Sequence, residues 1–110
     1  MIHCSATRED RPFTEQDLET AHRLRGFDGT GYHFYVCRNG DIKSTRLVER
    51  VGAHVRGHNA NSIGICYEGG LDCHGLAKDT RTEWQRHSLR VLVRALKMDY
   101  PEARIIGHRD

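Results

Sequence analysis

The stretch that decides the fold is Gly31-Tyr32-His33-Phe34-Tyr35-Val36-Cys37, followed by Asn39-Gly40 and then Asp41-Ile42-Lys43. Aromatic and β-branched residues favour strands, and Asn-Gly is a strong signal for a tight hairpin turn. The stretch therefore predicts a β-hairpin. Side chains alternate between the faces of a strand, which gives two sets of side chains here. One set is Tyr32, Phe34 and Val36, and the other is His33, Tyr35 and Cys37. The pattern leaves open which of the two faces a functional site.

Further elements are predicted on both sides of the hairpin. Thr14 can cap a helix that stops near Gly26, and Pro101 ends a longer helix. The predicted helices are 15–25 and 82–98, and the other predicted strands are 1–4, 62–67 and 103–107. This order indicates an α/β fold with a mixed central β-sheet flanked by helices, in one domain, 1–110.

Periodicity assigns a buried and a solvated side to each helix. For the first helix the predicted apolar stripe is Leu18, Ala21 and Leu24. For the second helix the side expected to cover the sheet is Trp84, Val91, Leu92, Ala95 and Leu96. A row of arginines at helical spacing is expected to be solvated: Arg81, Arg86, Arg90 and Arg94.

Composition narrows the class of protein. The net charge of +2 lacks the strong basic excess of a dedicated nucleic-acid binder, so no nucleic-acid partner is expected. No apolar run approaches the roughly 20 residues that span a bilayer, and no secretory signal is visible. We therefore expect synthesis in the cytoplasm, no membrane partner, and four free thiols, at Cys4, Cys37, Cys66 and Cys73.

Two of the eight histidines stand out. His3 and His108 each follow a short apolar run, so both imidazoles would emerge at strand ends on one edge of a sheet and share a metal. Cys4 should point away from His3, because successive strand residues face opposite ways. His54 and His58 have the spacing of a helical metal-binding pair, but the glycines around them disfavour a helix. We expect His22 and His87 to be solvated positions on the predicted helices, and His74, in a loop bounded by glycine, gives no signal of its own.

Several segments in order carry a resemblance to a known family. They are His3-Cys4-Ser5-Ala6-Thr7, Gly31-Tyr32-His33-Phe34, Gly52-Ala53-His54, Asn61-Ser62-Ile63-Gly64-Ile65-Cys66 and Gly107-His108-Arg109-Asp110. Together they resemble the zinc-dependent N-acetylmuramoyl-L-alanine amidases, in particular the phage-lysozyme branch, which is related to the peptidoglycan recognition proteins. The resemblance covers nearly the whole chain.

The resemblance implies a peptidoglycan amidase that hydrolyses the amide between N-acetylmuramic acid and L-alanine. It implies Zn²⁺ as cofactor, His3 and His108 as metal ligands, and Tyr32 as a catalytic residue. Zinc would polarise the scissile carbonyl, and Tyr32 would orient the attacking water or stabilise the oxyanion. His54 is implied as a substrate contact near the groove rim. A phage or prophage endolysin of this kind would reach the bacterial cell wall after release from the cytoplasm.

The sequence departs from the family pattern after His108. The third zinc ligand and a lysine that helps bind the oxyanion are expected in the following segment, and Asp110 lies too close to His108 to match. We therefore expect a domain truncated at its C-terminal end, with weakened zinc binding and impaired activity.

Other interpretations remain open at this stage. One is a non-catalytic peptidoglycan-binding module, because some peptidoglycan recognition proteins keep the groove without a full zinc site. Another is a metal-dependent nuclease, against which the near-neutral charge argues. A purely structural role for the histidines is a third. The sequence does not indicate an oligomeric state.

Overall fold

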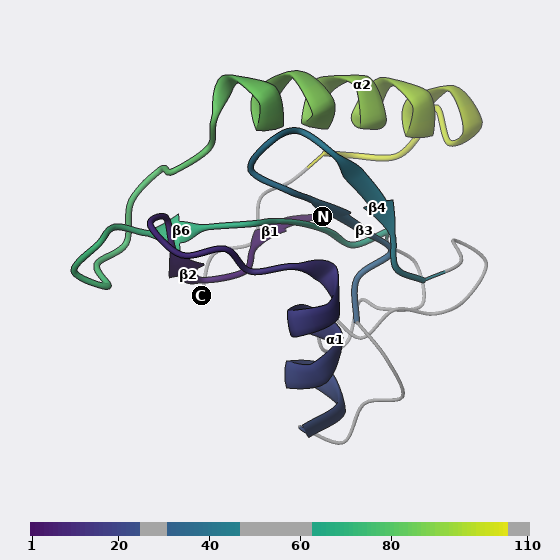
Figure 1. Ribbon diagram of the computed structural model, residues 1–110. Helices are drawn as coiled ribbons and strands as arrows, with labels where there is room; N and C mark the ends of the chain where they lie inside the picture. The colour runs from purple at the N-terminus through teal and green to yellow at the C-terminus, as the bar shows by residue number, and fades with distance from the viewer. Residues whose placement is uncertain (25–30, 47–62, 106–110) are drawn as a thin grey trace.

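The two described helices lie on opposite faces of a mixed sheet. The computed structural model describes residues 1–24, 31–46 and 63–105. In them, α1 (Glu15–Leu24) lies on one side of a four-stranded sheet and α2 (Glu83–Asp99) on the other (Figure 1). The predicted α/β fold, a mixed sheet flanked by helices, is therefore confirmed.

The main sheet has the order β1-β5-β3-β4. Its strands are β1 (Ile2–Cys4), β3 (Phe34–Val36), β4 (Ile42–Ser44) and β5 (Ile65–Tyr67). β5 pairs in parallel with both β1 and β3, whereas β3 and β4 form the predicted antiparallel hairpin. Gly40 in the hairpin turn has φ +94°, a conformation that glycine adopts without a steric penalty.

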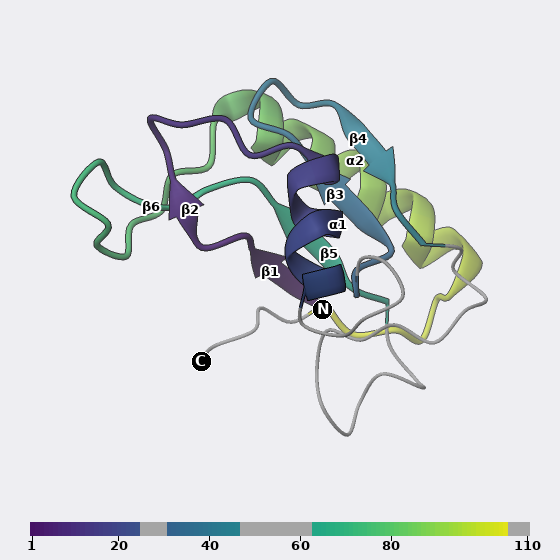
Figure 2. The same cartoon turned by 60° about the horizontal axis from the view of Figure 1, so that its bottom comes forward.

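A second, two-stranded parallel sheet continues from the first. It consists of β2 (Thr7–Arg8) and β6 (Gly70–Leu71), which lie side by side beyond the ends of β1 and β5 (Figure 2). Bends at Ala6 (φ 55°) and at Gly69 and Gly70 (φ 123° and 105°) separate the two sheets. A Cβ at Gly70 would lie 2.5 Å from the Cys4 sulfur, so only glycine fits this bend. The sequence did not predict this pair, because two residues are too few to show alternation.

Both helices begin with reciprocal capping bonds. Thr82 Oγ1 accepts a hydrogen bond from the Gln85 amide N–H, and the Thr82 N–H donates to the Gln85 side chain. Thr14 and Asp17 make the equivalent pair of bonds at α1, as the sequence predicted for Thr14. Such caps satisfy N–H groups that have no partner within the helix.

The face of α2 that covers the sheet differs in part from the prediction, which was right for Leu92 and Leu96. Leu89 and Leu92 pack with Val36 and Ile65 in an aliphatic cluster, with Leu96 beside it. Trp84 and Val91 are 65% and 49% exposed, and Ala95 is exposed as well. The buried side includes Gln85, whose amide donates to the carbonyls of Val36 and Glu68. The hydrophobicity pattern predicted the wrong centre for this face because the polar residue Gln85 lies there. The backbone carbonyls of the sheet accept the hydrogen bonds of its amide.

The stripe predicted for α1 was also wrong in part. Leu18 is buried, but Leu24 is 84% exposed and His22 takes the inward position four residues after Leu18. The arginines predicted to be solvated on and before α2 are exposed.

The predicted final strand is not present in the part of 103–107 that the structure describes. Residues 103–105 form no strand, and residues 106 and 107 lie outside the described ranges. Lys97 donates from Nζ to the carbonyls of Pro101 and Ala103, which holds this segment in a turn against the end of α2. Among the described helices, none combines the length and apolar character that a membrane crossing requires. All four cysteines are free thiols, as predicted.

Candidate functional site

The α1 side of the sheet carries a cluster of aromatic and polar side chains. Leu18, Tyr35 and Cys66 form its buried centre, and Phe13, Tyr32 and Cys37 pack around them. Tyr32 therefore lies on the same side as Tyr35, contrary to the predicted alternation. The reason is that β3 begins at Phe34, so Tyr32 precedes the strand and is not bound by its two-residue period.

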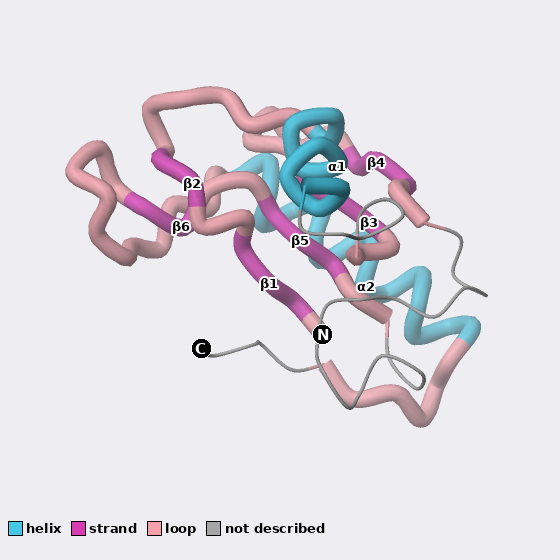
Figure 3. Tube along the Cα trace, turned by 90° about the horizontal axis from the view of Figure 1, so that it is seen from below, coloured by secondary structure: helices cyan, strands magenta, loops and turns pink. Residues whose placement is uncertain are grey.

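His3 lies beside Tyr32 in this cluster. It is the central residue of β1, in register with Cys66, and only 6% exposed. Its ring centroid is 5.1 Å from that of Tyr32, and the two planes are inclined at 56°. The sequence placed His3 at a strand end, whereas the structure places it in the middle of β1. In the structure Tyr32 precedes β3 and packs with the cluster on the α1 side of the sheet. Figure 3 shows α1 on this side, opposite α2.

His22 is the residue of this cluster that sequence reasoning missed. It was predicted to be solvated, but it is buried, with 7% exposed. Its Nδ1 accepts a hydrogen bond of 2.7 Å from the backbone N–H of Gly31, and its ring centroid is 5.5 Å from that of Tyr32. An accepting Nδ1 leaves the proton on Nε2 in the neutral ring. The spacing of four residues from Leu18 was the available signal, since i and i+4 share a helix face.

Tyr32 is thus packed between two imidazoles. His3 approaches it from β1 and His22 from α1, while the Gly31 bond fixes the backbone immediately before it. His33, the next residue, is 1% exposed and its Nδ1 accepts from the Gly64 N–H at 3.0 Å. His33 therefore ties the start of β3 to the start of β5, and Tyr32 is held from both sides along the chain.

Glu68 and Tyr35 hold the segment that leads into α1. The buried Glu68 carboxylate accepts from the N–H groups of Phe13 (2.7 Å) and Arg38 (3.0 Å), and the Tyr35 hydroxyl donates to the Phe13 carbonyl. Burial raises the pKa of Tyr35, and the nearby Glu68 carboxylate raises it further. Tyr35 therefore keeps its proton and acts as a structural donor. These bonds fix the start of α1, and with it the position of His22.

The cysteines of the cluster are suited to packing. Burial raises the pKa of Cys66 well above its ordinary value, and burial raises the pKa of Cys37 to about 11. Both are thiols at neutral pH, whereas a metal ligand or nucleophile requires the thiolate. Cys4 follows His3 on β1, and its sulfur lies against Gly70 at the bend between the two sheets.

The other site predictions fall in two groups. His54, His58 and His108 lie outside the described residues, so their positions stay predictions. His87 is exposed, as predicted, and His74 is exposed in its loop.

His3 has the donor chemistry that zinc takes, because a neutral imidazole nitrogen is among its preferred ligands. It comes from a strand and is held by its neighbours, which favours a fixed ligand position. In residues 1–24, 31–46 and 63–105, no three His, Cys, Asp or Glu side chains come close enough together to hold a metal ion. Of the two predicted zinc ligands, His3 is the one that lies in the described residues.

The fold and this cluster define the class of the protein, an α/β domain with a histidine and tyrosine pair on one face of a mixed sheet. All of residues 1–110 match the family model of N-acetylmuramoyl-L-alanine amidase. The chain belongs to this family, as the order of its motifs predicted.

Individual relatives agree with the family. The endolysin of Enterobacteria phage K11 is 34% identical over 109 residues, which are 99% of this chain and 72% of that endolysin. The solved structure of the endolysin amidase LysCS from Clostridium intestinale is 36% identical, with a TM-score of 0.77 over 92% of this chain and 62% of that one. Bumblebee PGRP-SA superposes with a TM-score of 0.80 at 24% identity, over 96% of this chain and 66% of that one, and so shows the fold alone. The chain thus spans under two thirds of the length of LysCS.

Proposed function

We propose that this chain is a peptidoglycan amidase that hydrolyses the amide between N-acetylmuramic acid and L-alanine, as part of a phage or prophage lysis system. The observation that carries the proposal is the contact between His3 and Tyr32 on one face of the sheet, in a chain of this family. The endolysin relatives support the biological setting.

His3 and His108 are the proposed zinc ligands. When bound, zinc would supply Lewis acidity toward the scissile carbonyl and the attacking water. His3 would offer a ring nitrogen to the metal. The pairing of β1 with β5 fixes the position of His3 along the sheet, in register with Cys66. A catalytic zinc normally has three protein ligands. The activity of the chain should therefore depend on how tightly it binds zinc.

Tyr32 is the proposed catalytic residue. Water adds its oxygen to the amide carbon, the C–N bond breaks, and the L-alanine nitrogen leaves as an amine with the proton that it gains. The Tyr32 hydroxyl would donate a hydrogen bond to the carbonyl oxygen as negative charge develops on it. A donor that is already in place is effective because it needs no reorganisation during the reaction. His22 and the Gly31 bond would keep Tyr32 in place, and His54 is the proposed substrate contact.

The test compares His3→Ala with His87→Ala, an exposed histidine on α2. Each protein is incubated with purified peptidoglycan, with zinc or with a chelator, and newly formed L-alanine amines are counted. Zinc content is measured separately. We expect His3→Ala to lose both zinc and amine release, and His87→Ala to keep both. Equal amine release by the two variants would refute the assignment of His3, and muropeptide binding without any amine release would instead identify a binding module.

A further inference from the structure

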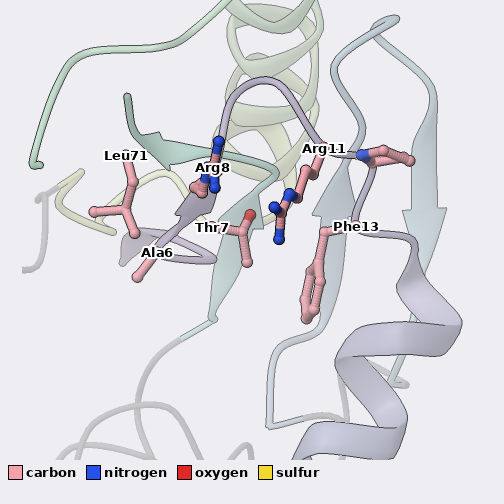
Figure 4. Close-up of a pocket in the computed structure, with 7 residues that line it drawn as sticks. Ala6, Thr7, Arg8, Arg11, Phe13 and Leu71 are labelled. Atoms are coloured by element: carbon pink, nitrogen blue, oxygen red, sulfur yellow. The ribbon is translucent and has the colours of Figure 1, made fainter. Parts of the chain in front are cut away.

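A hollow lies at the bend that follows β1, and neither His3 nor Tyr32 is among the residues that line it. Figure 4 shows the side chains of the lining. Its volume is about 330 Å³, within the range of small-molecule sites. Apolar side chains, among them Phe13 and Leu71, line it together with Arg8 and Arg11. In Figure 4 the Arg11 side chain reaches across the hollow between Thr7 and Phe13. A mainly apolar lining with a few charged groups is typical of ligand sites.

The cations around the hollow differ in how they are paired. Arg8 makes two hydrogen bonds to Asp10, from Nε at 3.0 Å and from a terminal nitrogen at 2.7 Å. Lys78 pairs with Glu9 at 2.9 Å. Arg11 has no ion pair or side-chain hydrogen bond within the described part of the chain, although the Asp10 carboxylate attracts it from beyond ion-pair distance. Its five donors are therefore available to an anion, and a guanidinium matches a carboxylate by two parallel hydrogen bonds.

The walls of the hollow are fixed in advance. The Arg11 N–H donates to the Arg8 carbonyl at 3.2 Å, which closes the turn between the two arginines. The Phe13 N–H is held by Glu68 at 2.7 Å. Thr7 Oγ1 lies 2.6 Å from the Ser5 hydroxyl. A site that is already ordered loses little entropy when a ligand binds.

The hollow is connected to the proposed reaction centre through one cluster. Phe13 on its wall and Tyr32 beside His3 both pack around Leu18, Tyr35 and Cys66. Thr7 follows His3 by four residues, and at about 3.3 Å per residue the two are at most roughly 13 Å apart. An extended peptide of three residues spans roughly 10 Å. A peptide whose first amide lies at His3 and which runs toward Thr7 would therefore bring its third residue near the hollow.

We propose that this hollow is a subsite for a free carboxylate of the peptidoglycan stem peptide, with Arg11 as the residue that binds it. Arg8 lines the site but is largely neutralised by Asp10, and the apolar wall receives the aliphatic part of the peptide. The inference rests on the proposed amidase function, which places the first amide of the peptide at His3. It adds a determinant of specificity that is separate from the residues proposed for hydrolysis.

The test measures binding without catalysis. The probe is a synthetic tripeptide that begins with N-acetyl-L-alanine, continues with D-glutamate and has two free carboxylates. The comparison probe is the same peptide with both carboxylates amidated. Calorimetric Kd values are compared for the unchanged chain, Arg11→Ala, Arg11→Lys and Arg94→Ala. Arg94 is an exposed arginine on α2, on the opposite side of the sheet.

We expect Arg11→Ala to weaken binding of the free acid by about tenfold or more, since a charged hydrogen-bonded contact is lost. Arg11→Lys should retain part of the affinity, and Arg94→Ala all of it. The amidated peptide should bind the unchanged chain as weakly as the free acid binds Arg11→Ala. Equal affinity of Arg11→Ala and Arg94→Ala would overturn the proposal, and so would equal affinity for the two peptides.

Amine release from peptidoglycan is measured in parallel, so the two proposals fail separately. Arg11-dependent binding without amine release by the unchanged chain contradicts the amidase function and leaves the carboxylate site intact. Amine release combined with Arg11-independent binding leaves the amidase function intact and contradicts the carboxylate site.

Discussion

The two faces of the main sheet have different chemistry although they share the same strands. The α2 face is aliphatic, with Val36 and Ile65 packed under Leu89 and Leu92. The α1 face holds Tyr35 and Cys66, with the histidines and Tyr32 beside them. An apolar face stabilises the folded state in proportion to the area that it buries. Buried polar groups, in contrast, each need a hydrogen-bond partner in a defined position.

The parallel register of β1, β5 and β3 places apolar residues on one face of the sheet and polar residues on the other. Ile2, Ile65 and Phe34 are aligned across β1, β5 and β3, and all three contribute to the α2-side cluster. The next residue on each strand gives the aligned row His3, Cys66 and Tyr35. A shift of one residue in any pairing would exchange these rows. Stability and the proposed chemistry are therefore specified by alternate residues of the same strands.

The largest effect on folding is expected on the α2 face. Leu92→Ala removes a buried side chain from the aliphatic cluster and should lower the free energy of unfolding by about 2–5 kcal/mol. Denaturant titration measures this, with Leu24→Ala as the control, because Leu24 is 84% exposed. If both variants lost the same unfolding free energy, the α2 face would not be the main source of stability.

The α1 face should respond in activity more than in stability. Tyr32→Phe keeps the ring packed but removes the proposed donor, so amine release should fall by roughly a hundredfold, or about 3 kcal/mol in the transition state. The midpoint of unfolding should change little. Tyr100→Phe, at a 45% exposed tyrosine, is the control. Unchanged turnover in Tyr32→Phe would exclude a catalytic role for the hydroxyl.

His22 should affect both properties. His22→Ala leaves the Gly31 N–H without its acceptor and removes one of the two rings against Tyr32, so we expect a loss of about 1–3 kcal/mol in unfolding free energy. Turnover should also fall, but by less than in Tyr32→Phe. His87→Ala, at an exposed position, is the comparison for both assays. Full activity in His22→Ala would limit this residue to a structural role.

The smallest effect should appear only at alkaline pH. The folded state raises the pKa of Cys37 from 9.0 to about 11, so folding favours the protonated thiol. Its contribution to stability is complete below pH 9 and is lost as the pH rises toward 11. Cys66 titrates in the same direction. Cys37→Ser should therefore flatten the alkaline decline in unfolding free energy, and an identical decline in the variant would contradict the assignment.

Local signals predicted the elements that depend on neighbouring residues. The hairpin followed from Asn39-Gly40, and the start of α1 followed from Thr14. The joint presence of His3 and Tyr32 at one site was predicted by the resemblance of their motifs, and the contact between their rings agrees with it. Neither the zinc ligands nor the role of Tyr32 is tested by this contact.

The errors have a common physical cause. Gln85 and His22 occupy buried helix positions that a hydrophobicity pattern assigns to solvent, because their hydrogen bonds to distant backbone groups offset the cost of burial. Tyr32 lies on the same side of the sheet as Tyr35, not on the predicted side, because β3 begins two residues after Tyr32. The pair β2 and β6 depends on bends at Ala6, Gly69 and Gly70 rather than on a strand pattern.

The sequence by itself determined the family, the fold class, the hairpin and the positions where both helices form, because these depend on motif order, periodicity and hydrogen bonds between near neighbours. Only the tertiary structure decided that His22 faces inward, that Tyr32 lies between two imidazoles, and that Arg11 lines an apolar hollow without an ion pair in the described residues. Those placements depend on parallel register and on the docking of α1, which are set by contacts between segments far apart in the chain.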